Sequence, residues 1–135
     1  MVTTMDATAS ISPDERHSAR WIDPTAPWPV DLTHLRRYTL GDKQLEIEIL
    51  GLFAAELPKA LVALKDASTP KAWHDASHTL KGSARAVGAW RLARAALAAE
   101  EQAERPGSET ALAALASVEA AAAEAVAYIR DLPAS

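Results

Sequence analysis

The sequence has no cysteine and few aromatic side chains, and each shortage excludes a class of structure. Without cysteine there are no disulfide cross-links and no thiolate metal sites. With one phenylalanine, two tyrosines and four tryptophans among 135 residues, aliphatic residues and alanine must fill most of the interior. The net charge of -4 argues against general nucleic-acid binding, which usually requires a basic surface.

Two further absences bear on where the protein acts. No apolar run approaches the roughly 20 residues that a membrane span requires. The N-terminus also lacks the basic segment followed by an apolar one that marks a signal peptide. We therefore expect a cytoplasmic protein with neither a membrane nor a nucleic acid as its partner.

Helical periodicity accounts for most of the chain. Residues 1 to 29 are rich in proline, serine, threonine and aspartate, so we expect a largely disordered N-terminal tail. Residues 30 to 135 contain alanine-rich periodic segments with few β-branched runs, which favours helices. The expected helices cover about residues 31–39, 42–65, 70–87 and 89–104. A last helix begins at residue 108 and ends between residues 129 and 132. Four substantial helices with short connections predict an all-α fold, an antiparallel four-helix bundle with a short preceding helix.

The ends of these helices carry recognisable signals. We expect Asp31, Thr69 and Ser108 to cap helix N-termini, with Thr110 as a competing cap near the last one. Gly88 stands where a helix that ends in a left-handed residue favours glycine.

The helix over residues 70–87 has one apolar face and one polar face. At about 100° per residue, the buried face consists of Trp73, Ala76, Leu80, Ala84 and Val87. By the same count His78 lies roughly 170° from the centre of that face, so we expect it to point into solvent. The residues that share its side are Lys71, His74, Asp75, Gly82 and Arg85, with Lys81 beside them.

An exposed histidine in these surroundings suits a carrier of phosphoryl groups. Imidazole has a reference pKa near 6.5, so at about pH 7 much of it is neutral, with a ring nitrogen free to attack phosphorus. Lys81 and Arg85 should disfavour the imidazolium form and offset the charge of a phosphohistidine. Glycine costs about 1 kcal/mol relative to alanine inside a helix. Gly82, one turn from His78, would leave room for a docking partner.

The segment from His78 to Ala89 resembles the signature of histidine-containing phosphotransfer (Hpt) domains. That signature is approximately H-x-L-K-G-[SA]-[SA]-x-x-[LV]-G-A, and the residues His78-Thr79-Leu80-Lys81-Gly82-Ser83-Ala84 and Val87-Gly88-Ala89 match every fixed position. The similarity covers about residues 30 to 131. The resemblance implies a helical bundle that relays phosphate between aspartates of response-regulator receiver domains.

The resemblance also implies roles for single residues. His78 would be the phosphoacceptor, Lys81 would stabilise the phosphate, and Gly82 would clear space for the receiver domain. His74, Arg85 and Lys71 complete the candidate docking face, although Arg85 and Lys71 taken singly are ordinary surface charges.

The same resemblance implies which partners and cofactors take part. The partners would be receiver domains or a hybrid histidine kinase, and the receiver would bring the aspartate and Mg²⁺. The chain would be a carrier and not an enzyme, would need no cofactor of its own, and would be a monomer. It has no G-x-x-x-x-G-K-[ST] sequence, so we expect no ATP hydrolysis.

Two other interpretations remain open. His74 and His78 are spaced as in the zinc motif H-E-x-x-H, with Asp75 in place of glutamate. The other histidines, His17 and His34, lie in the tail and on a distant helix, so a third ligand is not evident and we expect no metal site. A zinc-dependent hydrolase is therefore a remote alternative. The second alternative is a helical adaptor that binds a receiver domain without accepting phosphate.

Overall fold

The computed structural model describes residues 28 to 133, and this part of the chain contains five α-helices and no strand. The helices are α3 (Leu32–Thr39), α4 (Lys43–Asp66), α5 (Pro70–Val87), α6 (Trp90–Glu100) and α7 (Glu109–Arg130). The all-α prediction is therefore confirmed. The expected tail, residues 1 to 29, lies outside the described residues except at its last two positions.

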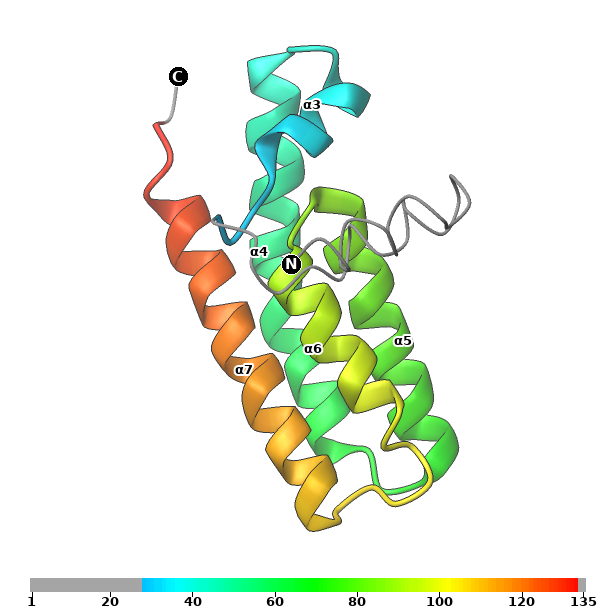
Figure 1. Ribbon diagram of the computed structural model, residues 1–135. Helices are drawn as coiled ribbons and strands as arrows, with labels where there is room; N and C mark the ends of the chain where they lie inside the picture. The colour runs from blue at the N-terminus through cyan, green and yellow to red at the C-terminus, as the bar shows by residue number, and fades with distance from the viewer. Residues whose placement is uncertain (1–27, 134–135) are drawn as a thin grey trace, which may run out of the picture.

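The helices α4 to α7 form an antiparallel bundle (Figure 1). Each helix packs against the next one in the chain, and α7 returns to pack against α4, which closes the ring. The short helix α3 lies across one end of the bundle, where it contacts α4 and α5. This is the predicted arrangement of four substantial helices preceded by a short one.

Side-chain caps begin four of the helices. The capping side chain in each case accepts a hydrogen bond from the backbone N–H three residues later, which satisfies a group that the helix itself leaves unpaired. The caps are Asp31 for α3, Asp42 for α4, Thr69 for α5 and Ser108 for α7. The expected caps are confirmed, and Ser108 rather than Thr110 caps the last helix.

Alanine allows the helices to pack closely. The sides of α6 and α7 that face the core contain, besides Leu92, Leu115 and Val118, mainly alanine. Most of the larger side chains come from α4 and α5, among them Phe53, Leu64, Trp73 and Leu80, and α6 adds Trp90 at its start. Small residues facing large ones let the two pairs of helices interdigitate, so a core with few aromatics is still filled.

Asp31 joins the start of α3 to the corner between α5 and α6. Its backbone N–H donates to the carbonyl of Gly88 at 2.8 Å, and its carboxylate accepts from the indole N–H of Trp90 at 3.0 Å. Gly88 has φ +82°, and a Cβ at that position would lie 2.8 Å from the carbonyl oxygen of Asp31. Glycine is required there by the left-handed backbone and by this close approach.

An ion pair between an exposed arginine and a buried glutamate fixes α3 to α4. Arg36 donates to both carboxylate oxygens of Glu46, at 2.9 and 3.2 Å, and Glu46 is buried. The hydrogen bond and the charge of Glu46 raise the pKa of Arg36. This paired geometry holds the short helix in one orientation over the end of the bundle.

Helix α6 is shorter than predicted, because it ends at Glu100 and not near residue 104. The next residues form tighter turns, in which Gln102 donates to the carbonyl of Ala99 and Ala103 to that of Glu100, three residues back. Such bonds tighten the chain at the end of a helix ahead of Pro106. Glu100 therefore stands at the C-terminus of α6.

Helix α7 corrects one sequence prediction. By length and composition this helix is apolar enough to cross a membrane, although no such run was expected. Ten of its 22 residues are alanine, which raises the mean hydropathy while adding little apolar surface. One face of the helix, including Leu115 and Val118, is buried in the bundle core. Because a core helix passes the same test, the composition of α7 is weak evidence for a membrane span.

Candidate functional site

His78 projects from the middle of α5 into solvent, as the helical periodicity predicted. Its side chain is 62% exposed, while Trp73, Leu80, Ala84 and Val87 on the opposite face are buried. Ala76, which was expected among the buried residues, is only half-buried. Ser77 is buried beside this face instead, and its hydroxyl donates to the backbone carbonyls of Trp73 and His74.

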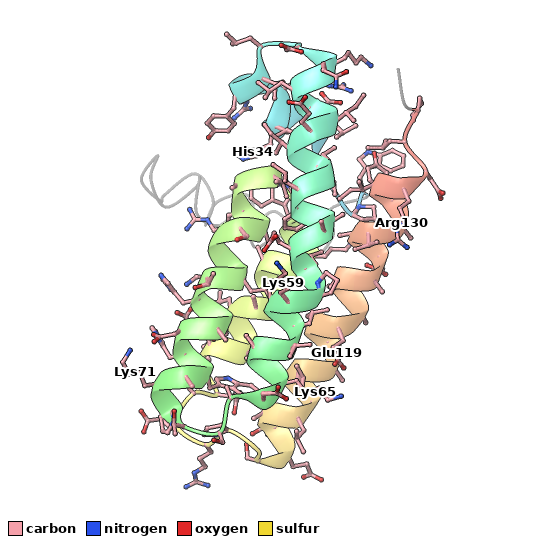
Figure 2. All side chains as sticks on the ribbon, turned by 180° about the vertical axis from the view of Figure 1, so that it is seen from behind. His34, Lys59, Lys65, Lys71, Glu119 and Arg130 are labelled. Carbon is pink, nitrogen blue, oxygen red and sulfur yellow. The ribbon has the colours of Figure 1, made fainter. Side chains whose placement is uncertain are left out.

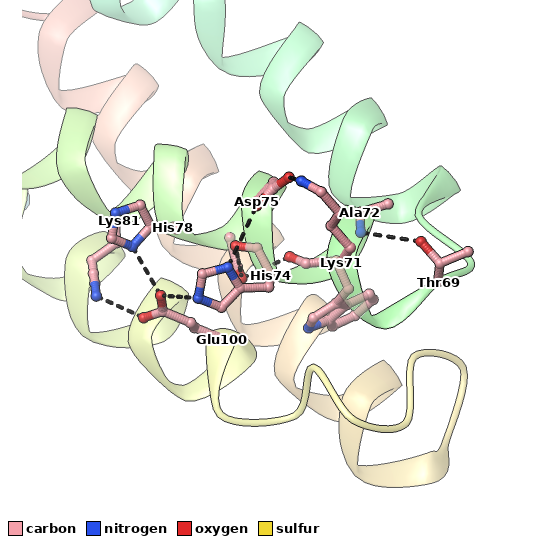
Figure 3. A network of polar contacts seen from close by, with 10 residues as sticks. Thr69, Lys71, Ala72, His74, Asp75, His78, Lys81 and Glu100 are labelled. Carbon is pink, nitrogen blue, oxygen red and sulfur yellow. Dashed lines mark hydrogen bonds and ion pairs between the residues drawn. The ribbon is translucent and has the colours of Figure 1, made fainter.

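A carboxylate from the neighbouring helix binds the exposed histidine. Oε2 of Glu100 lies 2.9 Å from Nδ1 of His78 and 3.2 Å from Nε2 of His74. Oε1 of the same carboxylate accepts a hydrogen bond from Nζ of Lys81 at 2.6 Å. Figure 3 shows Glu100 reaching from α6 to these three residues of α5. The site therefore consists of two histidines and a lysine that share one carboxylate.

The ionisation of Glu100 determines which nitrogen of His78 carries the proton. Burial alone would raise the pKa of Glu100, but the hydrogen bonds from Lys81 and His78, together with their charges, lower it below its ordinary value. An ionised carboxylate only accepts hydrogen bonds, so Nδ1 of His78 must donate. In the neutral ring the lone pair is then on Nε2. Glu100 thereby selects the tautomer of the exposed imidazole.

Packing in the bundle core positions Glu100. The indole N–H of Trp73 donates to the backbone carbonyl of Ala99 at 2.6 Å, in the buried interface between α5 and α6. Ala99 is in the last turn of α6, where carbonyls lack a partner within the helix. The same carbonyl accepts the backbone N–H of Gln102, so the indole bond is a second one on this oxygen, and it fixes the end of α6 against α5. Trp73 is thus a core residue, as expected, and it also holds the residue next to Glu100.

The face around His78 is less basic than expected. Lys71 is paired with Asp75 at 2.7 Å and points away from the bundle at the end of α5 (Figure 2). Hydrogen bonds from Lys71 and then His74 lower the pKa of Asp75, and the bond with Asp75 raises that of Lys71. Arg85 lies one turn beyond Lys81, in the last turn of α5. The predicted docking residues therefore lie along one helix. Two of them are paired with carboxylates, Lys71 with Asp75 and His74 with Glu100.

Gly82 faces open space. A Cβ built at Gly82 would meet no atom within 4 Å, so the packing of the bundle does not require glycine there. Beside it, a shallow groove between α4 and α5 is lined by apolar residues that include Leu52, Leu57 and Leu80. Leu52 is 67% exposed at its edge. A shallow, partly apolar groove therefore lies where α5 meets α4, next to Ser83.

The sequence did not identify the third member of the histidine cluster. His34 is buried on α3, where its ring contacts those of Tyr38 and Trp90. His17 lies outside the described residues. The third potential metal ligand is Glu100, and its ligand atom and those of His74 and His78 all lie within 4.8 Å of one another. The sequence made no third ligand evident, and the structure places the Glu100 carboxylate beside the two histidines as a candidate.

The fold and the site together define a helical-bundle protein in which two exposed histidines and a lysine gather around one carboxylate. The family model of the Hpt domain matches residues 48–129, which is more than half of the chain. The protein therefore belongs to the Hpt domain family. The match runs from within α4 to the end of α7 and does not include α3. No curated protein and no solved structure matches the chain.

Family membership establishes the general role of the protein. Hpt domains act in phosphotransfer within two-component phosphorelays, and they interact with response-regulator receiver domains and kinases. The protein is accordingly a phosphotransfer carrier and not a classical enzyme.

Proposed function

We propose that His78 accepts a phosphoryl group from the aspartyl phosphate of a receiver domain and passes it to the aspartate of another. The observation that carries this proposal is the hydrogen bond of 2.9 Å between Nδ1 of this exposed ring and the carboxylate of Glu100. That bond leaves the Nε2 lone pair available to a reagent arriving from solvent.

The transfer step follows from this tautomer. The Nε2 lone pair attacks phosphorus, an N–P bond forms, and the bond from phosphorus to the aspartyl oxygen breaks. The aspartate leaves as a carboxylate, and the phosphorylated ring keeps its proton on Nδ1. The ring gains positive charge as the bond forms, and the carboxylate of Glu100 at 2.9 Å stabilises that charge. Reversal of the same bonds returns the phosphoryl group to an aspartate.

Lys81 stabilises the negative charge of the phosphoryl group. Its side chain is 15% exposed and its ammonium group is held on Oε1 of Glu100, one turn from His78. An ammonium group at this place offsets the negative charge of the phosphoryl oxygens as they bind to the ring. Glu100 thus positions both the nucleophile, His78, and the cation that stabilises the phosphohistidine, Lys81.

The receiver domain docks over Gly82 and the groove between α4 and α5. Gly82 presents no side chain, and the exposed Leu52 adds apolar surface at the edge of the groove. His74, Arg85 and Lys71 lie along the same helix and contact the rim of the partner. The receiver supplies the aspartate and Mg²⁺, and the chain needs no cofactor of its own. A hybrid histidine kinase is an alternative donor.

We also propose how the chain is organised around this role. Residues 30 to 135 form the phosphotransfer unit, and residues 1 to 29 precede it as an N-terminal tail. The protein acts as a monomer in the cytoplasm, where the exposed histidine stays accessible to receivers.

Labelling by a phosphorylated receiver tests the assignment of His78. The wild-type protein should acquire phosphate that is labile in acid and stable in base, as expected for phosphohistidine. His78→Gln should acquire none. His74→Gln is the matched control, because it removes the other exposed histidine of the same face, and it should still become labelled.

Three outcomes would contradict the proposal. If His78→Gln is labelled as well as the wild type, the phosphoacceptor is another residue. If only His74→Gln loses the label, His74 is that residue. If the wild type binds the phosphorylated receiver but acquires no phosphate, the protein is an adaptor and not a carrier.

A further inference from the structure

The histidine cluster has the donor set of a transition-metal site. His74 and His78 are one turn apart on α5, and their rings are stacked with centroids 5.6 Å apart and planes 11° apart. Glu100 adds an oxygen from α6, and one ligand atom of each residue lies within 4.8 Å of the other two. Both rings are exposed, so an ion has open access from solvent.

The distances fit zinc. Bonds from Zn²⁺ to nitrogen and oxygen are about 2.0–2.2 Å long, so neighbouring ligands of a tetrahedral ion lie about 3.3 Å apart. Oε2 of Glu100 lies 3.2 Å from Nε2 of His74 and 2.9 Å from Nδ1 of His78. The ligand nitrogens of the two histidines lie within 4.8 Å of each other, and rotation of the two exposed rings would bring all three atoms to the ion. Two imidazoles and one carboxylate with an open fourth position form a familiar zinc donor set.

The surrounding side chains also suit bound zinc. Lys81 donates to Oε1 of Glu100 at 2.6 Å, which leaves Oε2 as the ligand atom and orients the carboxylate. Oδ1 of Asp75 lies 3.5 Å from Nδ1 of His74, the ring nitrogen that faces away from the cluster. The cation at Lys81 opposes the charge of the ion, so binding should be reversible and not structural.

We propose that His74, His78 and Glu100 bind one Zn²⁺ ion and that the bound ion prevents His78 from accepting phosphate. Zinc takes the lone pair of Nδ1, and the proton that Nδ1 carried moves to Nε2. The nitrogen that faces solvent then has no lone pair with which to attack phosphorus. The inhibition rests on the proposed phosphotransfer through His78, whereas the zinc site does not.

Titration of the full-length protein with Zn²⁺ near neutral pH tests the site without any phosphate. The wild type should bind one ion per chain, and the ring resonances of His74 and His78 should shift. His74→Asn and Glu100→Gln should each lower the affinity by roughly tenfold or more, since even outer-shell partners of a metal are worth that much. Glu101→Gln is the matched control one residue away, and it should bind zinc as the wild type does. Mg²⁺ should not compete, because it prefers oxygen ligands.

The inhibition is measured as the ratio of labelling rates with and without saturating Zn²⁺, taken separately for each protein. For the wild type and for Glu101→Gln this ratio should be roughly one tenth or less. It should stay near one for His74→Asn at the same zinc concentration, whatever the rate of that variant without zinc. Because every reaction uses the same receiver, this variant also controls for any effect of zinc on the receiver.

The outcomes separate the two parts of the proposal. Equal zinc affinity in the wild type and His74→Asn would overturn the site. Zinc binding through the three residues with unchanged labelling would overturn the inhibition. If the wild type binds zinc as expected but His78 is never phosphorylated, the proposed function and the inhibition fail and the metal site stands.

Discussion

Nδ1 of His78 lies 2.9 Å from Oε2 of Glu100, although 22 residues separate the two along the chain. The contact crosses from α5 to α6, and the same carboxylate binds Lys81 through its other oxygen. One acidic residue thus fixes the tautomer of the exposed imidazole and holds the nearby cation.

Substitution of Glu100 by glutamine should slow phosphotransfer roughly tenfold, the effect of losing about 1.4 kcal/mol. His78 and Lys81 donate to different oxygens of Glu100, and an amide replaces one of these oxygens by an NH₂ group, which cannot accept a hydrogen bond. The fraction of His78 with its proton on Nδ1 should fall, and nitrogen NMR of the ring measures that fraction directly. Glu101→Gln should change neither quantity. A slower transfer with an unchanged tautomer would show that Glu100 acts in some other way.

The stability that Glu100 contributes should disappear in acid. Its pKa is lowered on folding, so the contribution is complete above the ordinary glutamate pKa of about 4.3. The contribution is lost as the pH falls through the lower pKa of the folded state. Near neutral pH the wild type should be about 1 kcal/mol more stable than Glu100→Gln. Thermal unfolding should show this difference shrink below about pH 4, and a difference that grew in acid would contradict the assignment.

Substitution of Lys81 by alanine should slow phosphotransfer roughly tenfold while the bundle stays folded, since a charge-assisted hydrogen bond is worth about 1.5 kcal/mol. Circular dichroism checks the fold, and the initial rate of labelling checks the chemistry. Lys43→Ala is a control for loss of a positive charge, because Lys43 begins α4 near α3. Equal rates for wild type and Lys81→Ala would remove Lys81 from the mechanism.

Substitution of Gly82 by alanine should make the protein more stable and the transfer slower. Alanine favours a helix by about 1 kcal/mol over glycine, and a Cβ at position 82 meets nothing within 4 Å. Gly51 is the matched control: it is also helical and open, but it lies on α4 beside α3 and α7. Urea unfolding should show both variants stabilised, and receiver-dependent labelling should slow only in Gly82→Ala. Normal transfer in both would mean that no partner needs the space above Gly82.

Substitution of Gly88 by alanine should destabilise the protein more than the same change at Gly107. Both glycines have positive φ, +82° and +89°, so both variants lose about 1–2 kcal/mol to backbone strain. At position 88 the new methyl group would also lie 2.8 Å from the carbonyl of Asp31, whereas at position 107 it meets no atom within 4 Å. Overpacking adds about 1–3 kcal/mol. If Gly88→Ala and Gly107→Ala lose the same free energy of unfolding in urea, α3 can move away from the new methyl group at no cost.

Much of the fold follows from local sequence patterns. The caps Asp31, Thr69 and Ser108 and the left-handed end at Gly88 stand where the sequence places them, because each satisfies backbone groups within a few residues. The end of α6 was predicted four residues too late. The residues 101 to 104 are compatible with a helix, and the tighter turns that replace it depend on how the chain reaches α7.

The sequence by itself determined which side of α5 meets solvent, since a period of 3.6 residues places His78 opposite Leu80, Ala84 and Val87. Only the tertiary structure decided what faces that histidine. His78 and Glu100 are each eleven residues from Ala89, where the chain reverses between α5 and α6. Helices of equal rise place the two residues at the same level, but whether they meet depends on how each helix is rotated about its axis. The packing of Trp73 against Ala99 fixes the end of α6 at that level.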